Sequence, residues 1–242
     1  MEKLIFETAQ QMGKEAAVRA AALLNQAIMQ NGKARMLLST GQSQFEFFNN
    51  IILQDIDWEK VEIFHLDEYV GISGEHPASF VKYIKERLVK HISPKQVYFV
   101  DGAGNIEANI KYLTEQIKKE PIDVAMIGIG ENGHVAFNDP PADFDTKESY
   151  KVVTLDEKCR LQQVGEGWFD NIGQVPKKAV TMTVYQIMQS RHILSCVPHS
   201  VKAQAVKAVL ESEVNNQIPA TILKTHPSWV LLLDKDSASL LE

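Results

Sequence analysis

A glycine-rich segment in the middle of the chain, residues 128–139, reads GIGENGHVAFND and carries the residue types suited to acid–base chemistry. His134 can accept or donate a proton near neutral pH, and Asn132 and Asp139 lie near enough along the chain to orient its ring. The run before this segment, residues 122–127, is apolar almost throughout, which is typical of a parallel strand buried on both faces. A turn directly after such a strand is where an open α/β sheet binds its ligands. We therefore expect a proton-transfer site around His134.

The same segment also matches G-x-G-x-x-G, the fingerprint of dinucleotide binding, through Gly128, Gly130 and Gly133. That fingerprint needs a long helix starting at its third glycine, so that the pyrophosphate sits at the helix N-terminus. Here the run NDPP at residues 138–141 interrupts within two turns, and the preceding strand lies in the middle of the chain. The context therefore argues against a nicotinamide site. The glycines instead let the backbone bend tightly and approach a ligand closely.

A second polar segment, LSTGQS at residues 38–43, follows another apolar run. Small hydroxyl residues and a glycine lead into a helix there, so backbone N–H groups and the helix dipole can hold a phosphate. The segment is not a P-loop, because it has no Walker lysine. The alternative is a serine that only caps the helix after a glycine turn.

A third segment, LDEYVG at residues 66–71, places two neighbouring carboxylates at a strand end. Adjacent side chains of a strand point to opposite sides, so Asp67 and Glu68 should do different things, one in the crevice and the other in an interaction such as a salt bridge. A carboxylate in a crevice can move a proton between neighbouring carbons, which is the central step of aldose–ketose isomerisation. The alternative is a solvated acidic turn.

Lys202 lies where a strand gives way to a helix, in the run PHSVKA at residues 198–203. A cation in the first turn of a helix opposes the helix dipole. A bound anion at the same helix end removes that conflict, so Lys202 is a candidate phosphate partner. The alternative is a lysine that faces solvent.

Apolar runs of strand length alternate with segments of helical period along the whole chain, which predicts an α/β fold with a parallel, Rossmann-like sheet and helices on both faces. No repeat or Pro/Gly-rich linker divides these elements, so a single domain over residues 1–242 is expected. Strands are expected at residues 34–39, 61–66, 97–100, 122–129, 179–183, 192–197 and 229–233, and helices at about residues 7–31, 43–55, 78–91, 105–119, 157–168, 184–190 and 200–213.

Composition narrows the class of protein. With 242 residues, 45% of them hydrophobic and 23% charged, the chain is of an ordinary globular type. Its net charge of −6 argues against a broad nucleic-acid-binding surface but allows a local basic pocket for a phosphate. Cys159 and Cys196 show no metal-ligand spacing, and no signal peptide or long apolar span is present, so a reducing cytoplasm and no membrane contact are expected.

With these motifs in order, the chain resembles the glucosamine-6-phosphate deaminase (isomerase) family, whose relatives include 6-phosphogluconolactonases. The resemblance covers nearly the whole chain. Val135-Ala136-Phe137-Asn138 looks like the deaminase form of the motif rather than the lactonase form. The segments that carry it are LSTGQS at 38–43, LDEYVG at 66–71, HPASF at 76–80, GIGENGHVAFND at 128–139, FDN and QVPKKAVTMTV after residue 168, Lys202 with the following AxAV, and ATILKTHP at 220–227.

The resemblance implies a mechanism for a small-molecule sugar phosphate. Asp67 would move the proton from C2 to C1 of the opened amino sugar, and His134 would assist ring opening, oriented by Asp139 with Asn132 beside it. Water would then displace ammonia to leave fructose 6-phosphate. No metal or organic cofactor is expected, and the protein is expected to be a monomer or a homo-oligomer. The residues expected to hold the substrate and its phosphate are Ser39, Thr40, Gly41, Gln42, Ser43, Gly133, Arg160 and Lys202.

Several positions depart from the family pattern. The family commonly has an arginine for the phosphate just before an aromatic pair, where this chain reads Glu166-Gly167-Trp168-Phe169. Gly167 cannot bind phosphate, so Arg160, about two helical turns earlier, is the expected substitute. Asn132 stands where many members have aspartate, Asp139 where many have glutamate, and Gln42 replaces a second glycine.

These departures leave other functions open. A paralogue that acts on galactosamine 6-phosphate is one alternative, since the two sugars differ only at C4. A 6-phosphogluconolactonase-like hydrolase is another. A third is a non-catalytic phosphosugar sensor, although such proteins usually carry an N-terminal DNA-binding module, and residues 1–30 read as one amphipathic helix with no room for it.

Overall fold

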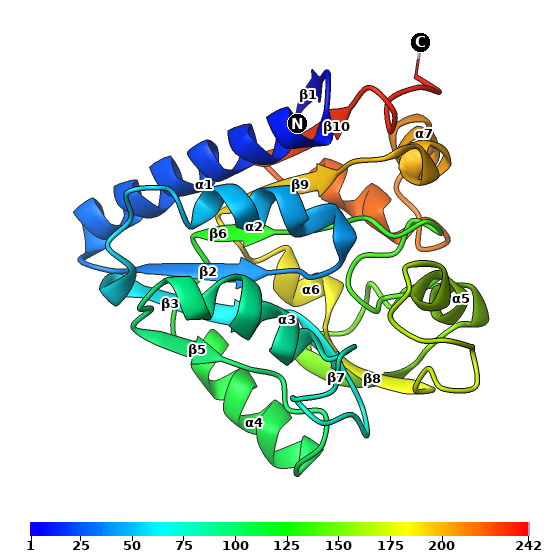
Figure 1. Ribbon diagram of the computed structural model, residues 1–242, viewed down its shortest axis with the longest axis horizontal. Coiled ribbons are helices and arrows are strands. Elements are labelled where there is room, and N and C mark those ends of the chain that lie inside the picture. Colours follow the sequence, from blue (N-terminus) through cyan, green and yellow to red (C-terminus); the bar gives the residue numbers. More distant parts are fainter. Residues whose placement is uncertain (242) are drawn as a thin grey trace.

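The computed structural model describes residues 1–241 and centres on a seven-stranded sheet in the order β1-β10-β9-β6-β2-β3-β5 (Figure 1). Every neighbouring pair in this sheet is parallel, as expected for alternating strands and helices. The strands are β1 (Glu2–Phe6), β2 (Ala34–Leu38), β3 (Val61–His65), β5 (Gln96–Tyr98), β6 (Val124–Met126), β9 (His192–Val197) and β10 (Trp229–Asp234).

The central strands end at the same level, which brings the loops after them together. Leu38 of β2 pairs with Met126 of β6 and with His65 of β3. All five residues of β2 are buried, as in a strand covered on both faces. The polar segments that follow β2, β3 and β6 therefore meet at one edge of the sheet, its carboxyl-terminal edge.

Helices cover both faces of the sheet. One face packs against α1, α2 and α3 through an aliphatic and aromatic cluster, and the other packs against α4, α6 and α7. The helices are α1 (Ala9–Asn31), α2 (Phe45–Ile51), α3 (Phe80–Arg87), α4 (Ile106–Ile117), α5 (Glu157–Gly165), α6 (Val184–Ile187) and α7 (Ala203–Glu211), and short 3-10 turns lie at Gln42–Gln44, Trp58–Lys60, Val89–His91, Ser200–Lys202 and Pro219–Thr225.

Small residues let the two helices α1 and α2 approach closely. A Cβ at Gly13 would lie 2.4 Å from Cβ of Glu46, so only glycine fits there. The side chain of Thr8 caps the N-terminus of α1 by accepting from the Gln11 N–H, and Gly32 ends the helix at φ +74°. This packing fixes α2, which begins directly after the LSTGQS segment.

A second, antiparallel sheet in the order β4-β8-β7 lies beyond the carboxyl-terminal edge, beside α5 (Figure 1). Its strands are β4 (Asp67–Tyr69), β7 (Tyr150–Thr154) and β8 (Lys178–Met182). The strand expected at residues 179–183 thus exists, but it belongs to this sheet and not to the parallel one. A third hydrophobic cluster around Tyr69, Phe137 and Phe169 packs these strands against α5.

The expectation that residues 1–30 form one helix is wrong at its start. Glu2–Phe6 form the edge strand β1, which pairs in parallel with β10 near the other end of the chain. Strands β4 and β7 were likewise absent from the sequence-based set. Among residues 1–241, no helix combines the length and the hydropathy needed to cross a bilayer.

Candidate active site

A cleft open to solvent lies at the carboxyl-terminal edge of the parallel sheet. It joins the three polar segments that follow β2, β3 and β6 and Lys202, which lies in the 3-10 turn after β9. Of the residues expected to act in chemistry or binding, it is lined by Ser39, Thr40, Gly41, Ser43, Asp67, His134 and Lys202.

Asp67 enters this cleft from the first position of β4. It is buried, and no hydrogen bond from another described residue reaches its carboxylate. Burial, reinforced by the neighbouring Glu68, holds the pKa of Asp67 well above its ordinary value. A buried carboxyl without a protein partner is poised to exchange a proton with a ligand.

Glu68 points the other way, as the alternation along a strand requires. Its carboxylate accepts from Ser79 Oγ at 2.6 Å, from the Val81 N–H at 3.0 Å and from the Tyr69 N–H at 2.9 Å. It thereby anchors the N-terminus of α3, where a negative charge is favoured. The two acids thus have different surroundings, as expected, although the partners of Glu68 are neutral donors and not a salt bridge.

The loop that carries His134 is folded tightly around the imidazole. The Gly130 N–H donates to the His134 carbonyl at 2.9 Å, and a Cβ at Gly130 would lie 2.2 Å from ring atoms Cε1 and Nε2. Only glycine therefore fits at position 130. No helix starts at Gly133, whose φ is +81°, so the dinucleotide fingerprint lacks its helix, as expected.

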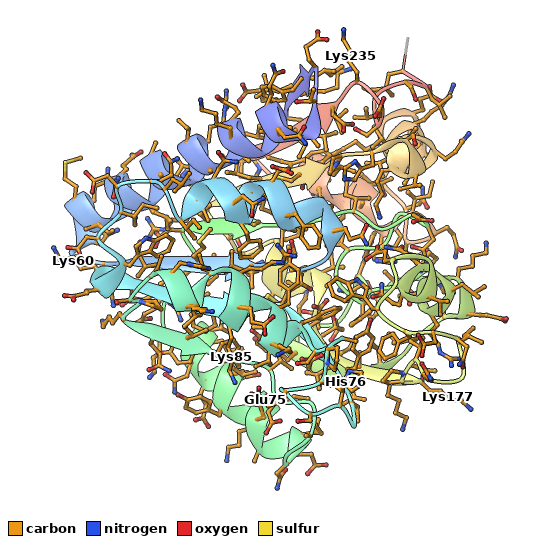
Figure 2. The ribbon with its side chains drawn as sticks, viewed as in Figure 1. Lys60, Glu75, His76, Lys85, Lys177 and Lys235 are labelled. Atoms are coloured by element: carbon orange, nitrogen blue, oxygen red, sulfur yellow. The ribbon has the colours of Figure 1, made fainter. Side chains whose placement is uncertain are left out.

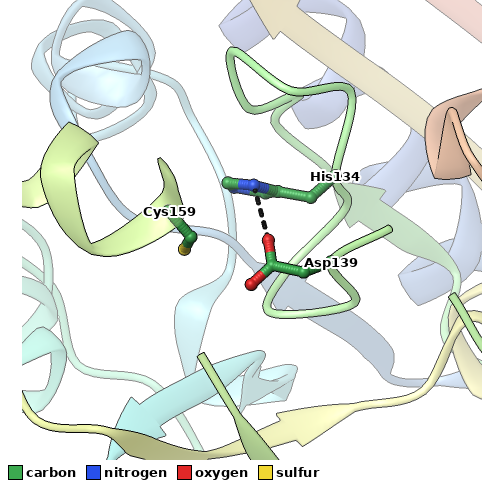
Figure 3. A group of neighbouring side chains, drawn as sticks. All are labelled: His134, Asp139 and Cys159. Atoms are coloured by element: carbon green, nitrogen blue, oxygen red, sulfur yellow. Dashed lines mark ion pairs between the residues drawn. The ribbon is translucent and has the colours of Figure 1, made fainter. Parts of the chain in front are cut away.

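Asp139 lies beside the imidazole of His134 (Figure 3). Oδ1 of Asp139 is 3.1 Å from Nδ1 of His134, which is ion-pair distance, but Nδ1 has no well-aligned hydrogen-bond partner. Asn132 donates to Oδ1 at 3.3 Å, and the Asp156 N–H donates to Oδ2 at 3.2 Å. Burial by itself would raise the pKa of Asp139. The contact with His134 and the hydrogen bonds from Asp156 and Asn132 outweigh burial, so the pKa of Asp139 is lowered. Asp139 and Asn132 thus lie behind the ring and outside the lining of the cleft, where they can orient it.

The segment after β2 forms a small cradle. Gly41 adopts φ +99°, a conformation that favours glycine, and a 3-10 turn at Gln42–Gln44 leads into α2. Ser43 Oγ accepts from Gln44 Nε2 at 2.9 Å, so its own proton is free to donate into the cleft. The hydroxyl of Ser39 is buried without a partner in the described residues.

Lys202 reaches the cleft from the 3-10 turn that precedes α7. Most lysines lie at the outer surface, as Lys60 and Lys235 do in Figure 2. Lys202 is only 6% exposed, and among the described residues it makes no ion pair or hydrogen bond. Burial lowers its pKa, and the acids Glu166 and Glu131 oppose this shift. A buried ammonium without a partner is suited to an anionic ligand.

Three expected binding residues take other positions. Arg160 does not line the cleft, because its guanidinium donates to the carbonyls of Ile172 and Val175. The side chain of Gln42 is exposed and donates to the Glu166 carbonyl. Gly133 is held by its carbonyl, which accepts from the Ala220 N–H at 2.8 Å. The structure therefore does not place Arg160 in the cleft, where a replacement for the family arginine would have to lie.

Helix α5 and the residue after it supply side chains that were not among the expected binding residues. Gln162, Gln163 and Glu166 line the cleft. The Glu166 carboxylate accepts from Gln162 Nε2 at 2.7 Å and from Trp168 Nε1 at 3.0 Å, and Gln163 accepts from the Tyr69 hydroxyl at 2.6 Å. The sequence contains a signal for this shared face, because Gln162, Gln163 and Glu166 lie three, four and seven residues after Cys159 and such positions fall on one side of a helix.

The comparisons with known proteins all indicate the same family. The profile described as glucosamine-6-phosphate isomerases/6-phosphogluconolactonase matches residues 7–231. A glucosamine-6-phosphate deaminase of Lactobacillus delbrueckii subsp. bulgaricus is 30% identical over 243 residues, covering 100% of both chains. One of Lactococcus lactis subsp. lactis is 34% identical over 216 residues, covering 88% of this chain and 89% of the relative.

Solved structures agree with this assignment. A monomeric glucosamine-6-phosphate deaminase superposes with a TM-score of 0.91 at 29% identity, covering 99% of this chain and 100% of the other. A 6-phosphogluconolactonase from Shewanella baltica superposes with a TM-score of 0.81 at 20% identity, covering 97% of each chain. The second likeness is one of fold alone.

Proposed function

Because the chain belongs to the glucosamine-6-phosphate isomerase/6-phosphogluconolactonase family, we propose that it converts a hexosamine 6-phosphate and water into a ketose 6-phosphate and ammonia. The relatives named glucosamine-6-phosphate deaminase support glucosamine 6-phosphate as substrate and fructose 6-phosphate as product. The observation that carries the proposal is the buried Asp67 carboxyl, which has no hydrogen-bond partner in the described residues and shares one cleft with His134 and Lys202.

The phosphate would lie between Lys202 and the cradle at residues 39–43. Lys202 offers a charge-assisted hydrogen bond, and the Ser43 hydroxyl offers a proton. The sugar would then extend across the cleft toward Asp67 and His134, with the whole chain acting as one sugar-phosphate domain. Ser39 has a further free hydroxyl at the foot of the cradle.

His134 would open the sugar ring. Its imidazole can take the proton of the C1 hydroxyl and return one to the ring oxygen, because Asp139 steadies the positive charge that forms in between. The contact between the two side chains is poorly aligned here, and such contacts often tighten only when substrate is bound. Asn132 supports Asp139 from the side away from the cleft.

Asp67 would then act on the open-chain amino sugar. Its carboxylate removes the proton from C2 and returns it to C1, while O1 gains a proton and the amino nitrogen loses one, which leaves an imine at C2. Water adds to that carbon and ammonia departs, so the balance is hexosamine 6-phosphate plus water to ketose 6-phosphate plus ammonia. Burial makes Asp67 a stronger base than an ordinary carboxylate, and carboxylate and imidazole supply every proton transfer in this scheme.

Glu166 sets this cleft apart from a purely basic phosphate site. Its carboxylate lines the same cleft as Lys202 and partly offsets that charge. A phosphate dianion would meet repulsion there as well as attraction. We therefore expect a weaker affinity for sugar phosphates than a site with a second cation would have.

A substrate panel tests the proposal. The purified protein is given glucosamine, galactosamine and mannosamine 6-phosphates and 6-phosphogluconolactone, and ammonia, ketose phosphate and acid are measured. We expect ammonia and a ketose phosphate in equal amounts, fastest from glucosamine 6-phosphate. Faster turnover of the galactosamine compound would change the substrate, and hydrolysis of the lactone alone would place the activity in the lactonase branch. Binding without any turnover would contradict an enzymatic role.

A further inference from the structure

Three potential metal ligands meet behind the cleft. One ring nitrogen of His134, a carboxylate oxygen of Asp139 and Sγ of Cys159 all lie within 4.8 Å of one another (Figure 3). His134 and Asp139 come from the loop after β6, and Cys159 comes from α5 on the opposite side. No other comparable group of His, Cys, Asp and Glu is found within residues 1–241.

Two features distinguish this cluster from an ordinary buried contact. The side chains of His134 and Asp139 are 10% and 8% exposed, and Cys159 is 1% exposed. Nδ1 of His134 is also a buried nitrogen without an aligned hydrogen-bond partner among the described residues, although it lies 3.1 Å from the Asp139 carboxylate. A nitrogen lone pair in that position is available to a metal ion.

The ligand set selects the kind of ion. Imidazole, thiolate and carboxylate together suit Zn²⁺, which binds such atoms at about 2.0–2.3 Å in tetrahedral geometry. Ligand atoms of a tetrahedral zinc site are then roughly 3.5 Å apart. The separation of 3.1 Å between Nδ1 and Oδ1, and the 4.8 Å limit for the whole group, are close to that spacing.

We propose that His134, Asp139 and Cys159 form a binding site for a thiophilic divalent cation, Zn²⁺ foremost, and that its occupation reversibly inactivates the enzyme. Binding forms a bond from the metal to Sγ, and the thiol proton of Cys159 passes to solvent. His134 binds as the neutral imidazole through Nδ1, with its remaining proton on Nε2. The site thus has three protein ligands and one position for water.

Inactivation follows from the loss of the acid–base cycle at His134. A metal on Nδ1 fixes the proton on Nε2, so the ring can no longer accept one from the sugar. The metal also takes the Asp139 carboxylate away from its role behind the ring. This part of the inference rests on the proposed function, whereas metal binding itself does not.

Cobalt binding tests the site without any assay of turnover. The chelator-treated full-length protein is titrated with Co²⁺, and the absorption band of a thiolate bound to cobalt is recorded. We expect one Co²⁺ per chain, with that band in the wild type and in Cys196→Ala but not in Cys159→Ala. Cys196 is a matched control, because it is equally buried but lies among the aliphatic residues of the sheet. Absence of the thiolate band in the wild type would overturn the proposal.

Zinc inhibition tests the consequence. We expect Zn²⁺ to stop ammonia release by the wild type, a chelator to restore it, and Cys159→Ala to need more than about 100-fold more Zn²⁺ for half inhibition, since even indirect partners of a metal change affinity by about 10–100-fold. Equal zinc sensitivity in Cys159→Ala and the wild type would contradict the proposal. Cys159→Ser serves if the alanine variant fails to fold, as judged by its melting curve. Absence of ammonia release from the metal-free wild type would count against the proposed function alone, because the cobalt band reports the site independently.

Discussion

Arg35 and Lys202 are both buried cations, at opposite edges of the parallel sheet, yet within residues 1–241 only Arg35 has polar partners. At the amino-terminal edge, the Arg35 guanidinium donates to the carbonyls of Ile117 at 3.0 Å and Gln116 at 2.7 Å, at the C-terminus of α4. It also lies 3.4 Å from a Glu62 carboxylate oxygen. Lys202, at the carboxyl-terminal edge, contacts no acid or carbonyl among the described residues at hydrogen-bond distance.

The buried acids show the same contrast. Asp123, at the amino-terminal edge, accepts from the Arg35 N–H at 2.8 Å and lies 3.5 Å from the Arg191 guanidinium. Asp67, at the carboxyl-terminal edge, accepts nothing from the described residues. Burial raises the pKa of both acids, but only Asp123 has partners that oppose the shift.

A buried charge without a partner lowers the stability of the fold, so its presence indicates that a bound ligand supplies the partner. We infer that the buried charges at the amino-terminal edge stabilise the fold, while those at the carboxyl-terminal edge bind or act on the substrate. Replacing charges at the two edges should therefore have opposite effects on stability and on turnover.

Asp67→Asn should have the largest effect, a loss of ammonia release of about 10²–10⁴-fold, because it removes the base but keeps the shape of the side chain. The melting temperature at pH 7 should rise. The folded protein holds the Asp67 proton more tightly than the unfolded chain, so ionisation costs stability as the pH rises above the ordinary value of 3.8.

Calorimetric melting of the wild type and of Asp67→Asn between pH 4 and pH 8 shows whether ionisation of Asp67 stabilises or destabilises the fold. The gain from Asp67→Asn should shrink toward pH 4 and grow with pH. A lower melting temperature for the variant at pH 7 would show that the Asp67 charge stabilises the fold.

Arg35→Met should lower the free energy of unfolding by about 3–5 kcal/mol, because it leaves the carbonyls of Gln116 and Ile117 without their donor and removes the buried cation beside Glu62. Turnover of the folded variant should stay within about twofold of the wild type, since the change is remote from the cleft. Urea unfolding and ammonia release measure the two quantities. Lys202→Met is the matched variant, and an equal loss of stability there would remove the distinction between the edges.

Gly130→Ala should reduce turnover by about 10²-fold, because the added Cβ would lie 2.2 Å from the His134 ring and force it aside. The Michaelis constant for the sugar phosphate should change less, since Lys202 and the cradle are not touched. Gly165→Ala is the control, as nothing lies within 4 Å of a Cβ there. Wild-type turnover in Gly130→Ala would mean that the ring position is not critical.

Glu166→Gln should have the smallest effect, a Michaelis constant lowered by about three- to tenfold, which corresponds to roughly 1 kcal/mol. Removing the carboxylate removes repulsion of the phosphate, and the gain should fade at high salt. Steady-state kinetics at low and high ionic strength measure it, with Glu157→Gln at the exposed start of α5 as control. A raised Michaelis constant would instead mean that Glu166 binds the substrate.

The sequence was sufficient to predict most of the parallel sheet and the meeting of its loops. Apolar runs identified β2, β3, β6, β9 and β10, and a parallel sheet then places the residues after them at one edge. Strand β1 was missed because five residues with a single neighbour, β10, form an edge strand only through pairing across the length of the chain. Pairing of β8 in a separate antiparallel sheet is likewise a tertiary property that its apolar pattern does not contain.

The side chains of α5 show where sequence reasoning ends. From their positions in the sequence, either Arg160 or Glu166 could have lined the cleft. The orientation of the helix decides between them, and it turns Arg160 toward the loop at Ile172 and Val175 and leaves Glu166 in the cleft. Charge alone favours the arginine, because a phosphate attracts a cation.

Calorimetric titration of the inactive Asp67→Asn protein with glucosamine 6-phosphate tests the central claim most directly, since it measures binding without turnover. We predict one site per chain, with a dissociation constant that rises by about 10- to 150-fold when Lys202→Met is added, because a hydrogen bond to a charged group contributes about 1.5–3 kcal/mol. Adding Arg35→Met instead should leave the dissociation constant unchanged wherever the protein is folded. An unchanged dissociation constant on loss of the Lys202 charge would contradict the claim that this buried cation is kept for the substrate.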